Sequence, residues 1–120
     1  MPILGEEKAR QGALSALEKK AIDLVVLNLQ GISNVTDYFV ICSARSTTQL
    51  GTIAEAIEAR LDEEKCPPLH REGTPESGWM LLDYGDVVAH IFLAETRAYY
   101  ALERLWGDAP ELAVGPSAGG

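Results

Sequence analysis

One stretch of the sequence, residues 78–92, decides the fold, and it reads Gly78-Trp79-Met80-Leu81-Leu82-Asp83-Tyr84-Gly85-Asp86-Val87-Val88-Ala89-His90-Ile91-Phe92. Gly85 and Asp86 separate two apolar runs. This pair fits a two-residue hairpin turn because Gly tolerates the positive φ that such turns require. With these two residues as the turn, the strands pair outward until Trp79 lies opposite Phe92.

The proposed register divides the hairpin into two faces, because successive side chains of a strand point to opposite sides of the sheet. One face is apolar: Met80, Leu82, Tyr84, Val87, Ala89 and Ile91. The other face combines large hydrophobic side chains with an acid and an imidazole: Trp79, Leu81, Asp83, Val88, His90 and Phe92. A core accepts buried Asp and His side chains only when they are paired. We therefore expect polar partners for Asp83 and His90.

The composition indicates one compact domain. The chain has 120 residues, of which 47% are hydrophobic and 23% are charged, and this length supports a modest single core. The sequence contains no uncharged apolar run of about 18 residues. Its charged N-terminus also lacks the apolar segment of a signal peptide. We therefore expect a cytoplasmic protein without a membrane span.

The net charge of −8 is distributed unevenly. Residues 1–60 carry six basic and seven acidic side chains, whereas residues 61–120 carry four and eleven, so the two halves have net charges of −1 and −7. An acidic surface repels nucleic acid, since phosphate binding requires Lys and Arg. The second half therefore predicts either a docking surface for a basic partner or a surface that only maintains solubility.

Hydrophobic spacing and turn residues predict the order of the elements. We expect helices at residues 5–20, 46–65 and 95–106, and strands at 22–29, 38–44, 69–72, 79–84 and 87–92. Ser46 and Gln49 match an S-x-x-Q capping box at the start of the second helix. This order predicts an α/β fold, a single domain with a mixed β-sheet flanked by α-helices. We expect the domain at residues 1–108 and a flexible tail at 109–120, which is rich in Gly, Pro and Ala.

Support for a catalytic site is weak. Asp83 and His90 are diagonal neighbours in the proposed register, so one interpretation is a catalytic dyad with Ser43 or Ser46 as the nucleophile. Neither serine lies in a G-x-S-x-G turn, and Ser46 already serves as a helix cap. We therefore expect no catalytic residues.

Support for a metal or cofactor site is equally weak. His70 and His90 are the only histidines, and neither has the sequence spacing of zinc ligands. Asp83 and Asp86 do not need to converge across a two-residue turn, which argues against a magnesium site. The chain also lacks a glycine-rich phosphate loop. We expect neither a metal nor a cofactor.

A series of short fragments between about Lys19 and Asp108 carries a family resemblance. The fragments are Lys20-Ala21-Ile22-Asp23, Thr36-Asp37-Tyr38-Phe39-Val40-Ile41, Ser43-Ala44-Arg45-Ser46, Glu72-Gly73, Trp79, Leu82-Asp83-Tyr84-Gly85-Asp86-Val87-Val88, His90, Arg97 and Tyr100-Ala101-Leu102-Glu103-Arg104-Leu105-Trp106. In this order and spacing they resemble the ribosomal silencing factor family, also called Iojap-like or RsfS.

The resemblance implies a nucleotidyltransferase-like topology without the chemistry of those enzymes. It also implies binding to the large ribosomal subunit at the ribosomal protein numbered fourteen, which blocks joining of the small subunit and lowers translation when nutrients are scarce. That partner is basic, which suits the acidic second half. The implied contact residues are Glu72, Trp79, Asp83, Tyr84, Asp86 and His90, with Arg97 in support.

Two other functions compete with this one. A nucleotidyltransferase-like enzyme would show a Gly-Ser pair followed by a D-x-D metal site. The chain instead has Cys42-Ser43-Ala44 and a D-x-x-D across a turn, which argues against catalysis. An acidic scaffold for another basic protein would use the same surface. The resemblance further implies a homodimer off the ribosome, in which exposed apolar residues such as Phe92 and Trp106 would be buried.

Overall fold

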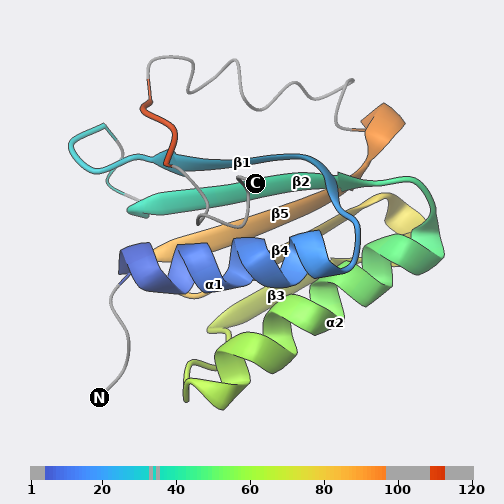
Figure 1. Ribbon diagram of the computed structural model, residues 1–120, viewed down its shortest axis with the longest axis horizontal. Coiled ribbons are helices and arrows are strands. Elements are labelled where there is room, and N and C mark those ends of the chain that lie inside the picture. Colours follow the sequence, from blue (N-terminus) through green and yellow to red (C-terminus); the bar gives the residue numbers. More distant parts are fainter. Residues whose placement is uncertain (1–4, 33, 35, 97–108, 113–120) are drawn as a thin grey trace.

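The computed structural model describes residues 5–32, 34, 36–96 and 109–112. Its elements, shown in Figure 1, are α1 (Gly5–Glu18), β1 (Ile22–Asn28), β2 (Tyr38–Ala44), α2 (Thr47–Glu63), β3 (His70–Thr74), the 3-10 helix η1 (Pro75–Ser77), β4 (Trp79–Asp83) and β5 (Val87–Leu93). This order confirms the first two predicted helices and the five predicted strands. The last predicted helix, at 95–106, lies outside the described residues apart from Glu95 and Thr96, which are helical.

The five strands form one mixed sheet with the order β1-β2-β5-β4-β3. β2 and β5 are parallel, and the other neighbouring strands are antiparallel. Parallel neighbours require a crossover connection, and α2 forms part of the segment that joins β2 to β3. The predicted α/β fold with a mixed sheet is therefore confirmed. Among the described helices, none combines the length and the apolarity that a membrane crossing requires.

The hairpin has the register that the sequence predicts. Trp79 lies opposite Phe92, and the backbone N–H of Tyr84 donates to the carbonyl of Val87 at 2.8 Å. Gly85 has a φ of +90°, which a residue with a Cβ adopts only with strain. The two faces assigned to β4 and β5 from sequence alternation are therefore the faces that the structure has.

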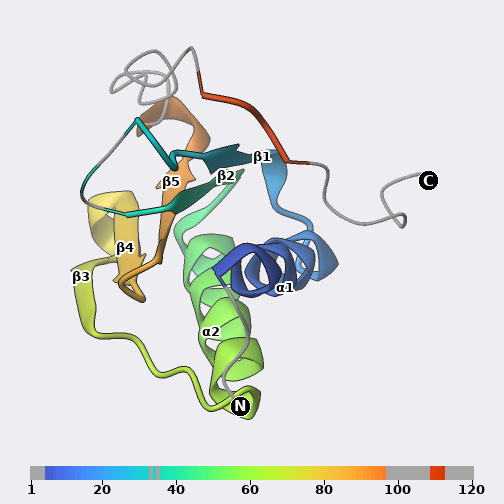
Figure 2. The same ribbon diagram turned by 90° about the vertical axis from the view of Figure 1, so that its left-hand side faces the viewer.

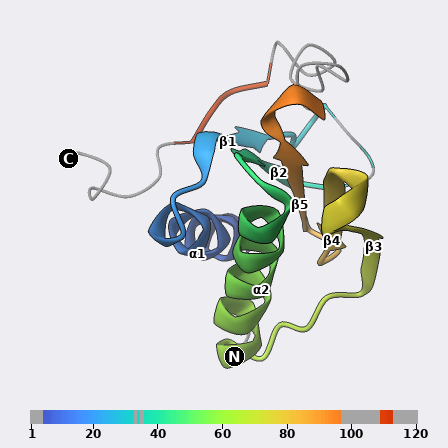
Figure 3. The same cartoon turned by 90° about the vertical axis from the view of Figure 1, so that its right-hand side faces the viewer.

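Both helices cover one face of the sheet, as the side views in Figure 2 and Figure 3 show. The sheet side chains in this core are apolar or aromatic: Val26, Tyr38, Val40, Cys42, Ala44, Met80, Leu82, Tyr84, Val87, Ala89 and Ile91. Three fully buried alanines of α1, at positions 9, 13 and 16, meet them. Small side chains at helical spacing let α1 lie close to the sheet.

A second, smaller cluster lies on the opposite face. Its buried members are Leu27, Leu29, Ile41, Phe92 and Ala109, and the half-buried Val25, Phe39 and Trp79 pack against it. Phe92 is fully buried within the chain. The expectation that Phe92 is exposed and available to a dimer interface is therefore wrong, because this cluster already encloses its ring. Trp106 lies outside the described residues.

The capping box at α2 differs from its expected form. The Ser46 hydroxyl accepts from the backbone N–H of Gln49 at 3.1 Å, as predicted. The Gln49 side-chain oxygen accepts from the backbone N–H of Arg45 at 2.6 Å, one residue before the cap. Its amide nitrogen donates to the carbonyls of Lys19 and Lys20 at 3.2 and 3.0 Å. One side chain thus joins the end of α1 to the start of α2.

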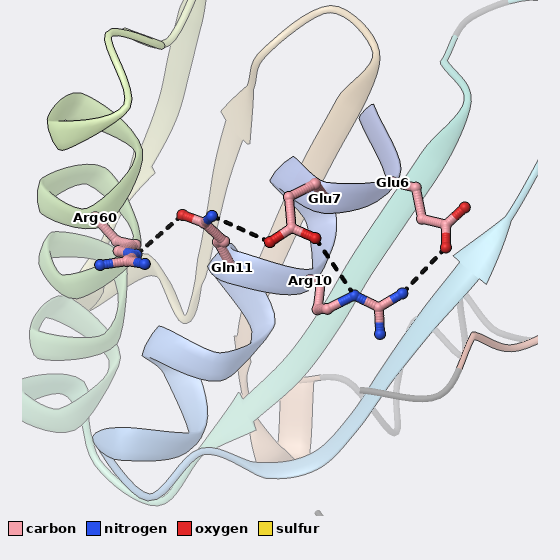
Figure 4. Close-up of polar contacts among 5 residues, drawn as sticks. All are labelled: Glu6, Glu7, Arg10, Gln11 and Arg60. Carbon is pink, nitrogen blue, oxygen red and sulfur yellow. Dashed lines mark hydrogen bonds and ion pairs between the residues drawn. The ribbon is translucent and has the colours of Figure 1, made fainter. Parts of the chain in front are cut away.

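Polar side chains also connect the outer surfaces of the two helices, as Figure 4 shows. Arg60 on α2 donates to Gln11 on α1 at 3.0 Å, and Gln11 donates to Glu7 at 3.1 Å. Arg10 pairs with Glu6 at 3.0 Å and with Glu7 at 3.7 Å. Exposed pairs of this kind contribute at most about 1 kcal/mol each. The apolar packing beneath them is therefore the main source of stability for the helical layer.

Residues 109–112 lie along the edge strand β1. The Asn28 N–H donates to the Pro110 carbonyl, and the Leu112 N–H donates to the Val26 carbonyl, both at 2.8 Å. The expected tail begins at residue 109, but these four residues pair with the sheet because β1 is an edge strand with free backbone groups. Residues 113–120 of the expected flexible tail lie outside the described residues.

Removing the paired segment should destabilise the protein. We expect a chain that ends at residue 108 to unfold with a free energy about 2–4 kcal/mol lower than a chain that ends at residue 112, since it loses two backbone hydrogen bonds and the packing of Leu112. Urea denaturation of both truncated proteins measures the difference. Equal midpoints and slopes would show that the segment contributes nothing.

Two glycines with nearly the same φ provide a matched test of the β3–β4 connection. Gly73 has a φ of +86° and Gly31 a φ of +80°. A Cβ at Gly73 would collide with the carbonyl oxygen of Trp79, whereas a Cβ at Gly31 meets nothing within 4 Å. Gly31→Ala should therefore cost only the backbone strain, about 1–2 kcal/mol. Gly73→Ala should cost roughly 2–5 kcal/mol, because the collision adds to that strain.

Thermal unfolding followed by circular dichroism compares the two alanine variants. A Gly73→Ala protein as stable as the Gly31→Ala protein would contradict the close approach of β3 and β4 at this position.

Candidate functional site

Acidic and aromatic side chains gather on the sheet face opposite the two helices. Directly opposed residues of antiparallel strands point to the same face, and β3 places Glu72 opposite Leu81 and His70 opposite Asp83. The structure thus brings four predicted site residues to one face, which we call the acidic-aromatic face: Glu72, Trp79, Asp83 and His90. Glu72 is exposed, Trp79 and Asp83 are half-buried, and His90 is buried.

Stacked rings support the face from below. The Trp79 and Phe92 rings are stacked, with their centroids 5.1 Å apart and an interplanar angle of 25°. The His90 ring meets Phe39 edge-on at 4.7 Å. The indole N–H of Trp79 donates to Nδ1 of His90 at 3.2 Å. Ring pairs of this kind fix the orientation of their side chains, so Trp79 is held in place.

The hydrogen bond from Trp79 also sets the protonation of His90. An indole nitrogen only donates, so Nδ1 of His90 accepts and the neutral ring carries its proton on Nε2. This Nε2 is buried and has no hydrogen-bond partner among the described residues. Burial lowers the pKa of His90 to about 4, because the charged ring would lose its hydration. A proton on Nδ1 would also face the indole N–H of Trp79.

The two carboxylates on the face have separate partners. Oδ1 of Asp83 accepts from the backbone N–H of Gly85 at 2.8 Å. The nearest oxygen of Glu72 lies 2.6 Å from Nε2 of His70. The expected polar partners of Asp83 and His90 are therefore the hairpin turn and Trp79, and the two residues are not joined as a dyad.

Two predicted site residues lie away from this face. Tyr84 is 6% exposed, on the face that α2 covers, and burial raises the pKa of its phenol. Asp86 forms an ion pair with Lys8 of α1 at 2.8 Å. The prediction that Tyr84 and Asp83 lie on opposite faces of the sheet is confirmed. Arg97 lies outside the described residues.

The described residues contain no group of three or more His, Cys, Asp or Glu side chains that could hold a metal ion. His70 lies at the edge of the sheet, in β3, while His90 lies on β5. Ser43 is buried in β2, and Ser46 caps α2.

A hollow beside Trp79 is a feature that no sequence pattern predicted. It has a volume of about 270 Å³ and is lined by Glu72, Gly73, Ser77, Trp79 and Leu81. The sequence offers His70 only as a candidate metal ligand, yet its side chain contacts Glu72, which lines the hollow. Its spacing of two from Glu72 was the available signal, since alternation places residues 70 and 72 on one face.

These features define a small α/β protein with a single mixed sheet and an acidic-aromatic face. A family model described as "Ribosomal silencing factor during starvation" matches residues 5–118. The chain belongs to the ribosomal silencing factor family, and the resemblance seen in its sequence fragments is confirmed.

Individual relatives agree with this assignment. The chain is 46% identical over 93 residues to the ribosomal silencing factor RsfS of Bacillus subtilis, covering 78% of this chain and 79% of that protein. It is 35% identical over 92 residues to "Mitochondrial assembly of ribosomal large subunit protein 1" of Mus musculus, covering 74% of this chain and 40% of that protein. A crystal structure from Chromobacterium violaceum superposes with a TM-score of 0.84 at 27% identity, covering 94% and 95% of the two chains.

The buried imidazole predicts a specific dependence of stability on pH. His90 in the unfolded chain binds a proton near pH 6.5, whereas folding lowers its pKa to about 4. The unfolded state therefore binds more protons between these values. Stability from neutral His90 is fully present above about pH 6.5 and is lost as pH falls towards 4, by about 3 kcal/mol.

His90→Gln removes this titration and keeps a side-chain acceptor for the indole of Trp79. Urea unfolding of the parent and the variant between pH 7 and pH 4 should show the parent losing about 3 kcal/mol more. Parallel curves for the two proteins would contradict a buried neutral His90.

Proposed function

We propose that this protein represses translation by binding the large ribosomal subunit and sterically blocking its association with the small subunit. The contact is made with the basic ribosomal protein numbered fourteen, under nutrient limitation, in the cytoplasm. The observation that carries the proposal is the acidic-aromatic face, where Glu72, Trp79 and Asp83 lie on one face of the sheet.

Family membership and charge both support this proposal. Relatives are named as ribosomal silencing factors, and the mouse relative is named for the assembly of a large ribosomal subunit. Residues 61–120 have a net charge of −7, which attracts a basic partner. Aromatic side chains near the centre of an interface commonly contribute most of the binding energy, and Trp79 is already held in position by His90.

The proposed mechanism requires no catalytic step. A protein that occupies the subunit interface acts through its shape and affinity, so we propose a non-enzymatic repressor. Tyr84 and Asp86 lie away from the acidic-aromatic face. Tyr84 packs in the core that α2 covers, and Asp86 forms an ion pair with Lys8 of α1. Direct contacts from Tyr84, Asp86 or Arg97, and a homodimer off the ribosome, stay predictions.

Subunit joining tests the proposal directly. Purified large subunits are mixed with the protein and then with small subunits, and gradient centrifugation measures the amount of joined ribosome. We expect co-sedimentation with the large subunit and a loss of joined ribosomes as the protein approaches saturation. Undiminished joining at saturating protein would refute the occlusion mechanism.

A matched pair of variants separates a docked carboxylate from general attraction. Asp83→Asn keeps an oxygen for the Gly85 N–H and removes one charge, while Glu55→Gln removes one charge from an exposed position on α2. Asp83→Asn should weaken large-subunit binding by about 2 kcal/mol, or roughly thirtyfold, because a charged partner loses its hydrogen bond. Glu55→Gln should weaken it less than about twofold, because exposed charges at a distance are screened.

Co-sedimentation at several protein concentrations gives the two affinities. Equal affinities of the two variants, with unchanged melting temperatures, would show that Asp83 does not contact the large subunit.

A further inference from the structure

We propose that the hollow beside Trp79 receives one basic side chain, arginine or lysine, from the protein that docks on the acidic-aromatic face. This inference rests on the proposed function and adds the chemistry of a specific subsite to it. The hollow is lined by Glu72, Gly73, Ser77, Trp79 and Leu81 and has a volume of about 270 Å³. This volume lies just below that of sites for drug-sized ligands, which begin at about 300 Å³, so the hollow has room for one long side chain.

The lining has the two groups that recognise a cationic side chain. Glu72 supplies a carboxylate, and its side chain is 64% exposed. A carboxylate has about four acceptor positions, so the contact with His70 leaves capacity for further donors. Trp79 supplies an indole ring, whose face attracts ammonium and guanidinium groups. Leu81 offers apolar surface to the methylene groups that lead to the charge.

Local hydrogen bonds hold the rim of the hollow. Thr74 and Ser77 form reciprocal hydrogen bonds at the ends of η1, each at 3.3 Å. The Ser77 hydroxyl donates to the carbonyl of Thr74 at 2.7 Å and accepts from the backbone N–H of Trp79 at 3.4 Å. These bonds tie η1 to the first residue of β4. A hollow that already has its bound shape loses little entropy when it is filled.

Other kinds of side chain fit this lining poorly. An apolar side chain would take water from the Glu72 carboxylate without giving it a hydrogen bond. An acidic side chain would be repelled by that carboxylate, and by the net charge of −7 on residues 61–120. A cation satisfies both the carboxylate and the ring, so the lining selects for positive charge.

The first experiment measures large-subunit binding by two isosteric variants. Glu72→Gln removes the carboxylate from the hollow, and Glu76→Gln removes an equal charge from exposed η1, four residues further along. We expect Glu72→Gln to weaken binding about tenfold to a hundredfold and Glu76→Gln by less than about twofold. If the parent binds and the two variants bind alike, the inference is overturned and the proposed function stands.

The second experiment does not involve the ribosome. The indole N–H signal of Trp79, assigned with a Trp79→Phe variant, is followed by NMR as the isolated protein is titrated with N-acetyl-arginine amide, N-acetyl-lysine amide or the uncharged N-acetyl-citrulline amide. We expect the arginine or the lysine compound to shift the signal at least threefold more than citrulline, and Glu72→Gln to abolish the difference. Equal shifts with all three compounds, or a difference that persists in Glu72→Gln, would overturn the inference even if large-subunit binding is observed.

Discussion

The turn between β4 and β5 is the constraint on which the rest of the structure depends. Its residue Asp86 contacts two other elements: the carbonyl accepts from the backbone N–H groups of Asp37 and Tyr38 at the start of β2, and the carboxylate binds Lys8 of α1. The turn also fixes the hairpin register, and a slip of one residue would move every side chain to the opposite face. Such a slip would turn His90 towards the helices and Ile91 towards the acidic-aromatic face, which would disrupt the apolar clusters on both faces of the sheet. Turn chemistry and hydrophobic alternation therefore support the same arrangement.

Features governed by local rules were predictable from the sequence. The hairpin register follows from Gly85 and from alternation, and both are properties of adjacent residues. The cap at Ser46 follows from a four-residue pattern. The same alternation placed Tyr84 and Asp83 on opposite faces of the sheet, which the structure confirms.

Features that join distant segments were not predictable in this way. The ion pair of Lys8 with Asp86 spans 78 positions of the chain, and no local pattern indicates which lysine meets which carboxylate. Residues 109–112 have the composition of a loop, yet they pair with β1 because the folded sheet offers an unpaired edge there. The sequence predicted a polar partner for His90 but did not identify that partner as Trp79. Diagonal proximity favoured Asp83, but Oδ1 of Asp83 accepts from the N–H of Gly85, and Nδ1 of His90 accepts from the indole of Trp79.

The acidic-aromatic face combines exposed charge with a buried support, and the two have different physical roles. Exposed carboxylates such as that of Glu72 give attraction and selectivity, but exposed charges contribute little free energy unless a partner orders them. The rings beneath the face order Trp79 instead. His90 remains neutral because it is buried, and a neutral Nδ1 can accept the indole N–H, whereas a protonated ring could not. Burial of His90 therefore keeps Trp79 oriented at neutral pH, and Trp79 in turn forms one wall of the hollow beside Glu72. A histidine of a type that commonly serves as a catalytic base or a metal ligand thus acts here as an uncharged support for Trp79 and the acidic-aromatic face.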